Sequence, residues 1–307
     1  MSIPKKMRDP EAHRLSFRYF PRGRDAFEHV LRLPAAKGRT VLLPAYIGWG
    51  PVEGSGVFDP VGASGLPYSF YPMKGRLTID VPALVRAIEA RPGSVVLLIH
   101  YFGFKDSGLA RIKKAAAKHG CLVVEDFAHA LFTFFRDPVV DFDYGVFSLH
   151  KMLPYENLTG GLLVARDGAA AGGRNEYTEF YRYNLEAIAR ARRANYQIVL
   201  ERLGRLEPPG VTILREKLGE NVPESFPILL PSRAVRDRVH SRMNAEGFGL
   251  ISLYHQLIAE VDESFRTERR ISDRVTNLPI HQDAAPEEVR RMVDALGKLL
   301  RSGELHG

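Results

Sequence analysis

Short, predominantly apolar runs alternate with longer amphipathic stretches through the first half of the chain. The apolar runs, which we expect to form buried strands, cover residues 41–43, 95–100, 121–125, 145–148 and 162–165. The stretches at 81–89 and 107–119 have the periodicity and end signals of helices. Strands that are apolar on both faces and alternate with helices are typical of a mainly parallel sheet covered on both sides.

The pattern changes after the sequence "EPPG", residues 207–210, which ends a long helix expected from about 176 to 203. Four further elements are then predicted: a strand at 226–230, a helix at 234–246, a strand through Leu278 and a last helix that begins with Pro286. We therefore predict an α/β protein with two domains. Residues 1–207 form a large domain with a mainly parallel, seven-stranded sheet flanked by helices, and residues 208–307 form a smaller α+β domain.

Composition is ordinary for a globular protein of 307 residues, with 45% hydrophobic and 26% charged residues. The longest clean apolar run, residues 95–99, suits a strand and is too short to span a membrane. No apolar stretch of the kind a signal peptide needs follows the first residues, so the default expectation is a cytoplasmic protein. The single cysteine, Cys121, lies in the apolar run "CLVV" and is expected to be a small core residue.

The formal net charge of +7 favours anionic partners without distinguishing nucleic acid from phosphorylated metabolites. The densest basic segment, "RARRANYQ" at 190–197, is interpreted as a solvated helix face rather than a phosphate site. The sequence has no RNA-binding signature and no Cys/His spacing for a metal. Neither a metal nor a nucleic-acid partner is therefore expected.

Three short motifs carry residues suited to chemistry. "VVEDFAHAL" places Asp126 at a strand end with His129 three positions later, and "SLHK" places Ser148 and Lys151 just after the next strand. "PRGRDAFEHVL" places Gly23 at the start of an apparent helix, where free backbone amides can meet a phosphate. Each motif has an ordinary alternative: a turn aspartate, a packed neutral histidine, a chance Ser-x-x-Lys or a plain helix start.

Together the motifs match the needs of pyridoxal phosphate, which requires a Schiff-base lysine, a carboxylate at its ring nitrogen and donors around its phosphate. Lys151 is the candidate lysine and general base, and Asp126 is the candidate carboxylate. The candidates for holding the phosphate are Ser148 and the backbone amides of Gly23, Arg24 and Asp25. Trp49 is the candidate for stacking on the ring, and its alternative role is that of a partly buried core aromatic.

The ordered set of motifs resembles the DegT/DnrJ/StrS sugar aminotransferases, which are pyridoxal-phosphate enzymes of the aspartate-aminotransferase fold type. The matching stretches, in order, are "GRDAF", "VLLPAY", "YSFYPMKGRLTID", "VLLIHYFGF", "CLVVEDFAHAL", "FSLHKMLPYENLTGG" and "TNLPIHQDAAPEEV". The resemblance implies Asp126 at the pyridine nitrogen, His129 near the phenolic oxygen, Ser148 on the phosphate and Lys151 as the Schiff-base lysine. It also implies a homodimer with active sites at the subunit interface.

The chain departs from that pattern as a short, divergent member. In many members the lysine lies two positions further from the serine. In addition, the segment that supplies a partner-subunit asparagine to the phosphate in the family is not found between residues 160–161 and the long helix. In some relatives a histidine replaces the Schiff-base lysine, and those enzymes dehydrate a sugar. This chain has His150 next to the lysine position, but Lys151 is present, so that activity is not expected. By position in the family pattern, the substrate candidates are Tyr155, Glu156, Asn157 and His281.

The first hypothesis is an aminotransferase that passes an amino group from an amino acid such as glutamate to a keto sugar linked to a nucleotide. A second hypothesis keeps the cofactor but makes the enzyme a lyase, dehydratase or condensing enzyme, because fold and cofactor do not settle reaction class. A third is a binding or regulatory relative without activity, and a fourth is nucleic-acid binding through the basic surface.

Overall fold

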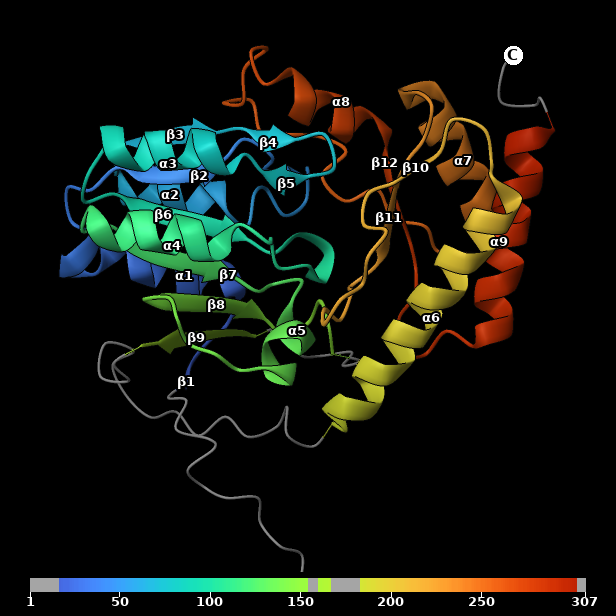
Figure 1. Cartoon of the computed structure of the whole chain (residues 1–307), viewed down its shortest axis with the longest axis horizontal. Helices are drawn as coiled ribbons and strands as arrows, with labels where there is room; N and C mark the ends of the chain where they lie inside the picture. The colour runs from blue at the N-terminus through green and yellow to red at the C-terminus, as the bar shows by residue number, and fades with distance from the viewer. Residues whose placement is uncertain (1–16, 154–159, 167–182, 303–307) are drawn as a thin grey trace, which may run out of the picture.

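The computed structural model describes residues 17–153, 160–166 and 183–302, and a seven-stranded sheet organises the first part (Figure 1). The strand order is β1-β9-β8-β7-β6-β2-β3. The strands are β1 (Phe17–Phe20), β2 (Val41–Pro44), β3 (Tyr68–Tyr71), β6 (Val95–Ile99), β7 (Leu122–Asp126), β8 (Tyr144–Ser148) and β9 (Gly161–Ala165). The strands from β3 through β8 pair in parallel, whereas β9 is antiparallel to both β8 and β1. The predicted mainly parallel sheet is confirmed.

Helices cover both faces of this sheet, as the wholly apolar strands require. Helices α3 (Val81–Ala90) and α4 (Leu109–Lys118) lie side by side on the face turned to the viewer in Figure 1. Helices α1 (Gly23–Arg32) and α2 (Phe58–Ser64) pack together on the other face. The predicted helices at 81–89 and 107–119 are thus confirmed, with end points that differ by one or two residues.

The C-terminal part is built around a small antiparallel sheet with helices against it. Its strands are β10 (Thr212–Ile213), β11 (Phe226–Leu229) and β12 (Val275–Leu278). Its helices are α7 (Arg233–Ala245), α8 (Arg266–Arg274) and α9 (Pro286–Arg301). The long helix α6 (Leu185–Leu206) packs along α9 (Figure 1). The α+β pattern is confirmed, and the division at residue 207 stays a prediction.

Side chains at helix starts explain several boundaries. Asn184 caps α6 by accepting a hydrogen bond from the Ala187 amide at 3.0 Å, so the helix begins at Leu185, later than the expected start near 176. Residues 176–182 lie outside the described residues. Asp80 caps α3 in the same way, at 3.1 Å from the Ala83 amide. Cys121 is buried at 8% exposure beside β7, as expected for a core residue.

Several elements have no counterpart among the sequence predictions. They are β1, α2, β3, β4 (Met73–Lys74), β5 (Thr78–Ile79), α5 (Leu131–Arg136), β10 and α8. The strands among them have two to four residues, which is too short for a periodic pattern. Within the described ranges, no helix is long and apolar enough to cross a membrane.

Candidate active site

Two predicted site residues end neighbouring strands of the large sheet. Asp126 is the last residue of β7, and Ser148 is the last residue of β8. These strands pair in parallel, with Asp126 opposite Val146. Their carboxyl ends therefore meet at one edge, which points toward α5 and the small sheet in Figure 1. Ligands of open α/β sheets bind at this kind of edge.

Lys151 lies in the turn that follows β8, and its amine meets His129. The distance between Lys151 Nζ and His129 Nε2 is 3.2 Å. Burial, followed by the charge of Lys151, lowers the pKa of the His129 imidazole well below its usual 6.5. A neutral ring can accept the lysine's hydrogen bond through Nε2, which leaves Nδ1 to carry the proton. Nδ1 is buried and has no partner among the described residues, so a ligand could supply one.

Asp126 lies within electrostatic reach of the same lysine. Its Oδ1 accepts a hydrogen bond from the Ala128 amide at 2.7 Å. Burial raises the pKa of this carboxyl, while the Ala128 amide and the charges of Lys151 and His100 oppose that rise. The side chain is partly accessible to solvent at the end of its strand. The carboxyl and the amine predicted to act on one ligand are therefore neighbours.

A buried ion cluster supports the strand that presents Asp126. The preceding residue, Glu125, is 1% exposed and contacts both His100, at 2.7 Å, and Lys113 of α4. Successive side chains of a strand point to opposite faces, so Glu125 ties the strand to its neighbours without occupying the site. The Phe127 ring lies 4.5 Å from the His100 ring and stacks on Phe147 at 5.0 Å. The end of β7 is consequently held by charge and aromatic packing together.

Two residues predicted to hold the phosphate, Gly23 and Ser148, meet where α1 begins against the end of β8. A Cβ added to Gly23 would lie 3.2 Å from the Phe147 carbonyl oxygen and 3.4 Å from Ser148 Cβ. Ser148 is 4% exposed, and its Oγ lies 3.1 Å from His150 Nδ1. Gly161 is packed more tightly still, since its added Cβ would lie 2.4 Å from the Arg22 carbonyl oxygen. The structure thus brings Gly23 and Ser148 together.

The side chains next to Gly23 are engaged elsewhere. Arg24 forms an ion pair with Asp59 at 3.3 Å, and Asp25 forms one with Arg22 at 2.8 Å. The Asp25 amide also donates to the Arg22 carbonyl at 3.1 Å. A ligand at this helix start would therefore meet the first backbone amides of α1 rather than these two side chains.

Trp49 is 42% exposed, and its amide donates to the Gln256 carbonyl at 2.9 Å. Two other aromatic rings lie next to His129: the ring centroid of Phe102 is 6.1 Å from that of His129, and the centroid of Tyr254 is 5.8 Å from it. The stacking role of Trp49 stays a prediction.

The predicted substrate residues are only partly placed. His281 is about half exposed, with its Nδ1 3.7 Å from Asp283. Tyr155, Glu156 and Asn157 lie outside the described residues.

Three residues that the sequence analysis did not select line the same region. Tyr254 packs against His129, and its φ of 60° is in the left-handed region that favours glycine. Glu224 interacts electrostatically with Lys151 and with Tyr254. Arg192 donates to the Glu224 carbonyl at 2.8 Å and to the Met152 carbonyl at 3.4 Å. The segments that carry Tyr254 and Glu224 are far from the strand ends in sequence and showed no motif.

The interpretation of residues 190–197 as a solvated face is wrong for Arg192. Its neighbour Arg190 is 64% exposed, but Arg192 is 4% exposed and points into the protein. Its Nε also donates to Gln282 at 2.9 Å. A buried guanidinium needs acceptors for several N–H donors. Those of Arg192 join the turn of Lys151 to the segments of Glu224 and Gln282 in the C-terminal part.

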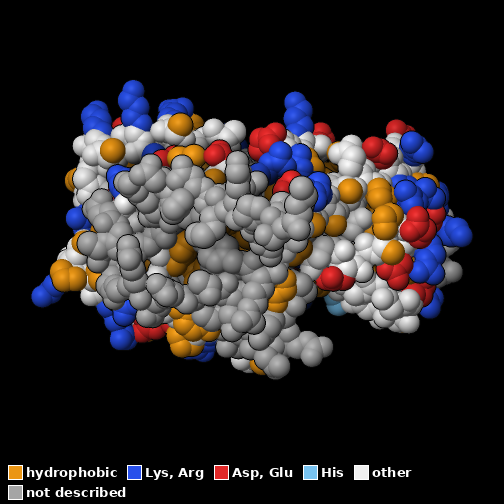
Figure 2. Space-filling model, turned by 90° about the horizontal axis from the view of Figure 1, so that it is seen from below, with side chains coloured by type: hydrophobic (Ala, Val, Ile, Leu, Met, Phe, Trp, Pro, Cys, Tyr) orange, Lys and Arg blue, Asp and Glu red, His pale blue; other side chains and the backbone are white. Residues whose placement is uncertain are grey.

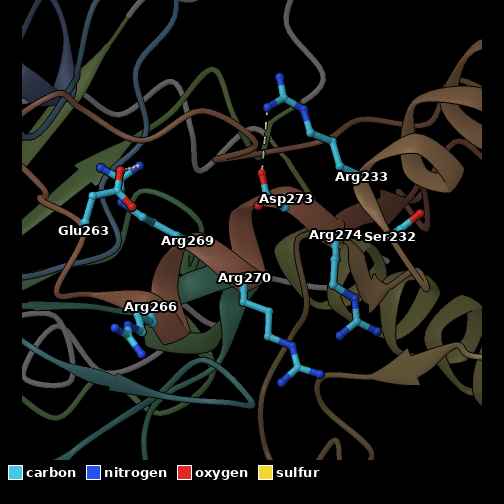
Figure 3. Close-up of a pocket in the computed structure, with 8 residues that line it drawn as sticks. All are labelled: Ser232, Arg233, Glu263, Arg266, Arg269, Arg270, Asp273 and Arg274. Carbon is cyan, nitrogen blue, oxygen red and sulfur yellow. Dashed lines mark ion pairs between the residues drawn. The ribbon is translucent and has the colours of Figure 1, made fainter.

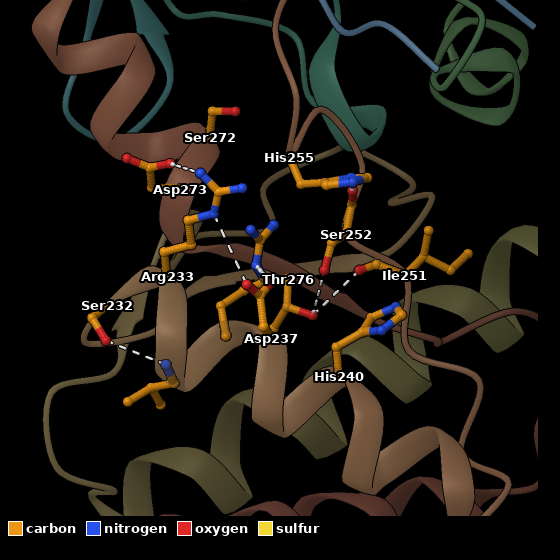
Figure 4. A network of polar contacts seen from close by, with 12 residues as sticks. Ser232, Arg233, Asp237, His240, Ile251, Ser252, His255, Ser272, Asp273 and Thr276 are labelled. Atoms are coloured by element: carbon orange, nitrogen blue, oxygen red, sulfur yellow. Dashed lines mark hydrogen bonds and ion pairs between the residues drawn. The ribbon is translucent and has the colours of Figure 1, made fainter. Parts of the chain in front are cut away.

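A hollow beside α8 has a volume of about 380 Å³. Figure 3 shows its lining residues: Ser232, Arg233, Glu263, Arg266, Arg269, Arg270, Asp273 and Arg274. Arg233 pairs with Asp273 at 4.0 Å and with Asp237 at 3.9 Å, and in a separate contact nearby the Thr276 hydroxyl donates to the Ile251 carbonyl at 3.3 Å (Figure 4). The hollow shares no residue with the lysine site. A different residue of α8, Ser272, contacts a residue near that site, because its Oγ donates to the Tyr254 carbonyl.

Basic residues are dispersed on the face seen in Figure 2. Lys and Arg side chains form separate groups there, and those of the C-terminal part are interleaved with Asp and Glu. No group of His, Cys, Asp and Glu side chains in the described part of the chain could hold a metal ion.

Comparison with known proteins agrees with this architecture. Residues 62–178 match the model of the DegT/DnrJ/EryC1/StrS aminotransferase family. No curated protein matches the chain in sequence. Among solved structures, PseC of Helicobacter pylori, an aminotransferase of pseudoaminic acid biosynthesis, is similar with a TM-score of 0.74 and 15% identity, over 93% of this chain and 87% of that one.

Two further structures are similar over most of their length. DesI, solved in the presence of its TDP-sugar product, has a TM-score of 0.73 and 20% identity over 94% of this chain and 82% of that one. DesV of S. venezuelae has a TM-score of 0.72 and 17% identity over 93% and 85%. The chain thus has the fold of these aminotransferases, and its residues 62–178 match the DegT/DnrJ/EryC1/StrS aminotransferase family model.

Proposed function

We propose that the chain is a pyridoxal-phosphate-dependent aminotransferase that transfers an amino group from an amino acid such as glutamate to a nucleotide-linked keto sugar. The observation that carries the proposal is the contact between Lys151 and His129 beside the strand end of Asp126. The TDP-sugar product of DesI, a structural neighbour, supports a nucleotide-linked acceptor.

The residues present fit this cofactor. An amine, a carboxyl and a close-packed glycine lie at one sheet edge, and a side chain in place of Gly23 would fill the space beside Ser148. His129 Nδ1 is a buried donor without a partner among the described residues, which suits a ligand oxygen. When bound, the cofactor would supply an aldehyde carbon that carries the amino group from donor to acceptor and a ring that withdraws electrons from the reacting carbon.

Each side chain has a role that follows from its surroundings. Asp126 holds a proton at the ring nitrogen, and Lys151 binds the cofactor and moves a proton as general base. His129 stays neutral and orients Lys151 Nζ. Ser148 Oγ and the first amides of α1 hold the phosphate.

Three further expectations belong to this proposal. The protein is a homodimer with active sites at the subunit interface, and it works in the cytoplasm. Its chain divides near residue 207 into a cofactor-binding large domain and a small C-terminal domain.

The visible absorbance spectrum of the purified protein tests the cofactor assignment. We expect a cofactor band that Lys151→Ala abolishes and that Lys118→Ala, a change at an exposed lysine of α4, leaves in place. Asp126→Asn should keep some cofactor but lower turnover by at least about a hundredfold. Turnover of Asp126→Asn at the parent rate would contradict the role of this carboxyl.

The reaction class is tested by adding amino acids to the loaded protein. An aminotransferase should convert its cofactor to a stable amino form, with loss of the visible band. A lyase, dehydratase or condensing enzyme should bind cofactor without this conversion. A regulatory relative should show no band at all after cofactor is added, and Lys151→Ala should then change nothing.

A further inference from the structure

Glu224 is fixed next to the lysine turn by its backbone. It lies between β10 and β11, where its amide donates to the Phe102 carbonyl at 2.9 Å. Its own carbonyl accepts from Arg192 Nη1 at 2.8 Å, and Nη2 of the same guanidinium lies 3.4 Å from the Met152 carbonyl, one residue after Lys151. Phe102 also stacks on His129. One buried arginine and one aromatic ring therefore place Glu224 in the wall of the site.

The carboxyl group of Glu224 is incompletely paired. Its Oε2 is excluded from solvent and has no hydrogen-bond partner among the described residues, although the residue as a whole is partly accessible. Burial raises the pKa of this carboxyl, while Ser225, Arg192 and Lys151 oppose the rise. An unpaired buried carboxyl oxygen costs stability, of the order of 1–3 kcal/mol. Such a cost in the free protein is explained if a ligand completes the pairing.

The chemistry of a carboxylate restricts the group that it can bind. An ionised carboxyl only accepts hydrogen bonds, so it attracts O–H and N–H groups and repels carboxylates and phosphates. A sugar presents several hydroxyl groups around its reacting carbon, whereas an amino-acid donor presents a carboxylate next to its reacting carbon. An unpaired carboxylate oxygen within electrostatic reach of Lys151 therefore suits a sugar hydroxyl.

We infer that Glu224 is a specificity-determining residue whose Oε2 accepts a hydrogen bond from a hydroxyl group of the sugar bound beside Lys151. The inference rests on the proposed function and adds to it a residue that recognises the acceptor. No covalent step is involved.

Calorimetric binding of unreactive nucleotide sugars to the cofactor-loaded protein tests the inference. The probes are dTDP-glucose and UDP-glucose, which have no keto group, each compared with its nucleoside diphosphate alone. Glu224→Gln keeps the shape but removes the charge, and we expect it to weaken binding of the better nucleotide sugar about tenfold. Binding of the nucleoside diphosphate should not change. Glu224→Asp, which keeps a carboxyl, should recover part of the loss.

The matched control is Glu220→Gln, at a residue 82% exposed on the same segment, which should bind like the parent protein. The melting temperature provides a second measurement. Because Oε2 lacks a partner, Glu224→Gln should keep or raise it, whereas a purely structural role predicts a fall.

Unchanged sugar affinity in Glu224→Gln overturns the inference and leaves the proposed function intact. Equal weakening of nucleotide sugar and nucleoside diphosphate overturns it as well, as does a lower melting temperature with loss of cofactor. Failure of the loaded parent protein to bind either nucleotide sugar overturns the proposed sugar acceptor together with the inference. Absence of the cofactor band in the parent protein is a separate result, and it overturns the proposed function.

Discussion

Replacing Glu125 by glutamine should destabilise the protein in a way that depends on pH. This carboxylate is 1% exposed and lies between His100, at 2.7 Å, and Lys113. Burial alone would raise its pKa, but the hydrogen bond and charge of His100, followed by those of Lys113, outweigh burial and lower the pKa from 4.5 to about 2. The side-chain amide that Glu125→Gln introduces would keep the shape and lose the charge.

The size of the effect follows from linkage. At about 1.4 kcal/mol for each pKa unit, the fall to about 2 corresponds to about 3 kcal/mol of unfolding free energy. Because the folded-state pKa of Glu125 is lowered, this stabilisation is fully present above pH 4.5 and is lost as the pH falls toward 2. Removing one partner of a buried ion cluster costs about 3–5 kcal/mol in other proteins, which agrees with this value.

Urea unfolding, followed by circular dichroism at several pH values between 7 and 3, measures the effect. At pH 7 we expect Glu125→Gln to lower the unfolding free energy by about 3 kcal/mol, and we expect the difference from the parent to shrink toward pH 3. Glu89→Gln, at an exposed glutamate of α3, serves as the control. A difference that stays constant from pH 7 to pH 3, or a loss below about 1 kcal/mol at pH 7, would refute the reasoning.

Two further predictions concern packing and protonation. Gly161→Ala should lower the unfolding free energy by about 2 kcal/mol, because the added Cβ would lie 2.4 Å from the Arg22 carbonyl oxygen, whereas Gly204→Ala in α6, with no atom within 4 Å, should raise it by up to about 1 kcal/mol. Urea midpoints that shift in the same direction would contradict this. Because the pKa of His129 is lowered in the folded protein, below about pH 6.5 this histidine binds a proton in the unfolded chain but stays neutral in the folded one. Acidification from pH 7 to 5 should therefore lower the stability of the parent protein. His129→Gln should reduce that loss, and an unchanged loss would show that His129 is not its source.

The buried strands of the large sheet and the residues at their ends could be predicted from the sequence because they depend on local pattern. Wholly apolar runs such as 95–99 must be buried on both faces, and parallel strands must end at one edge. Asp126 and Ser148 could therefore be assigned to that edge from their positions alone. Lys151 became a candidate because it lies three residues after Ser148 in the motif "SLHK", and its role as the Schiff-base lysine stays a prediction.

Contacts between distant segments could not be predicted in this way. Arg192 looked like one of several helix-surface arginines, and only the packing of α6 against the segments of Met152, Glu224 and Gln282 buries it. Likewise, the position of the unpaired Glu224 Oε2 depends on tertiary packing, because Glu224 and Met152 are more than seventy positions apart in the sequence and both contact Arg192. Periodicity reports how one element relates to solvent, whereas the neighbours of a buried polar group are decided by how several elements pack. For that reason the sequence was sufficient to predict the mainly parallel sheet and the α+β pattern after it, while the tertiary structure decided which buried charges lie near the lysine.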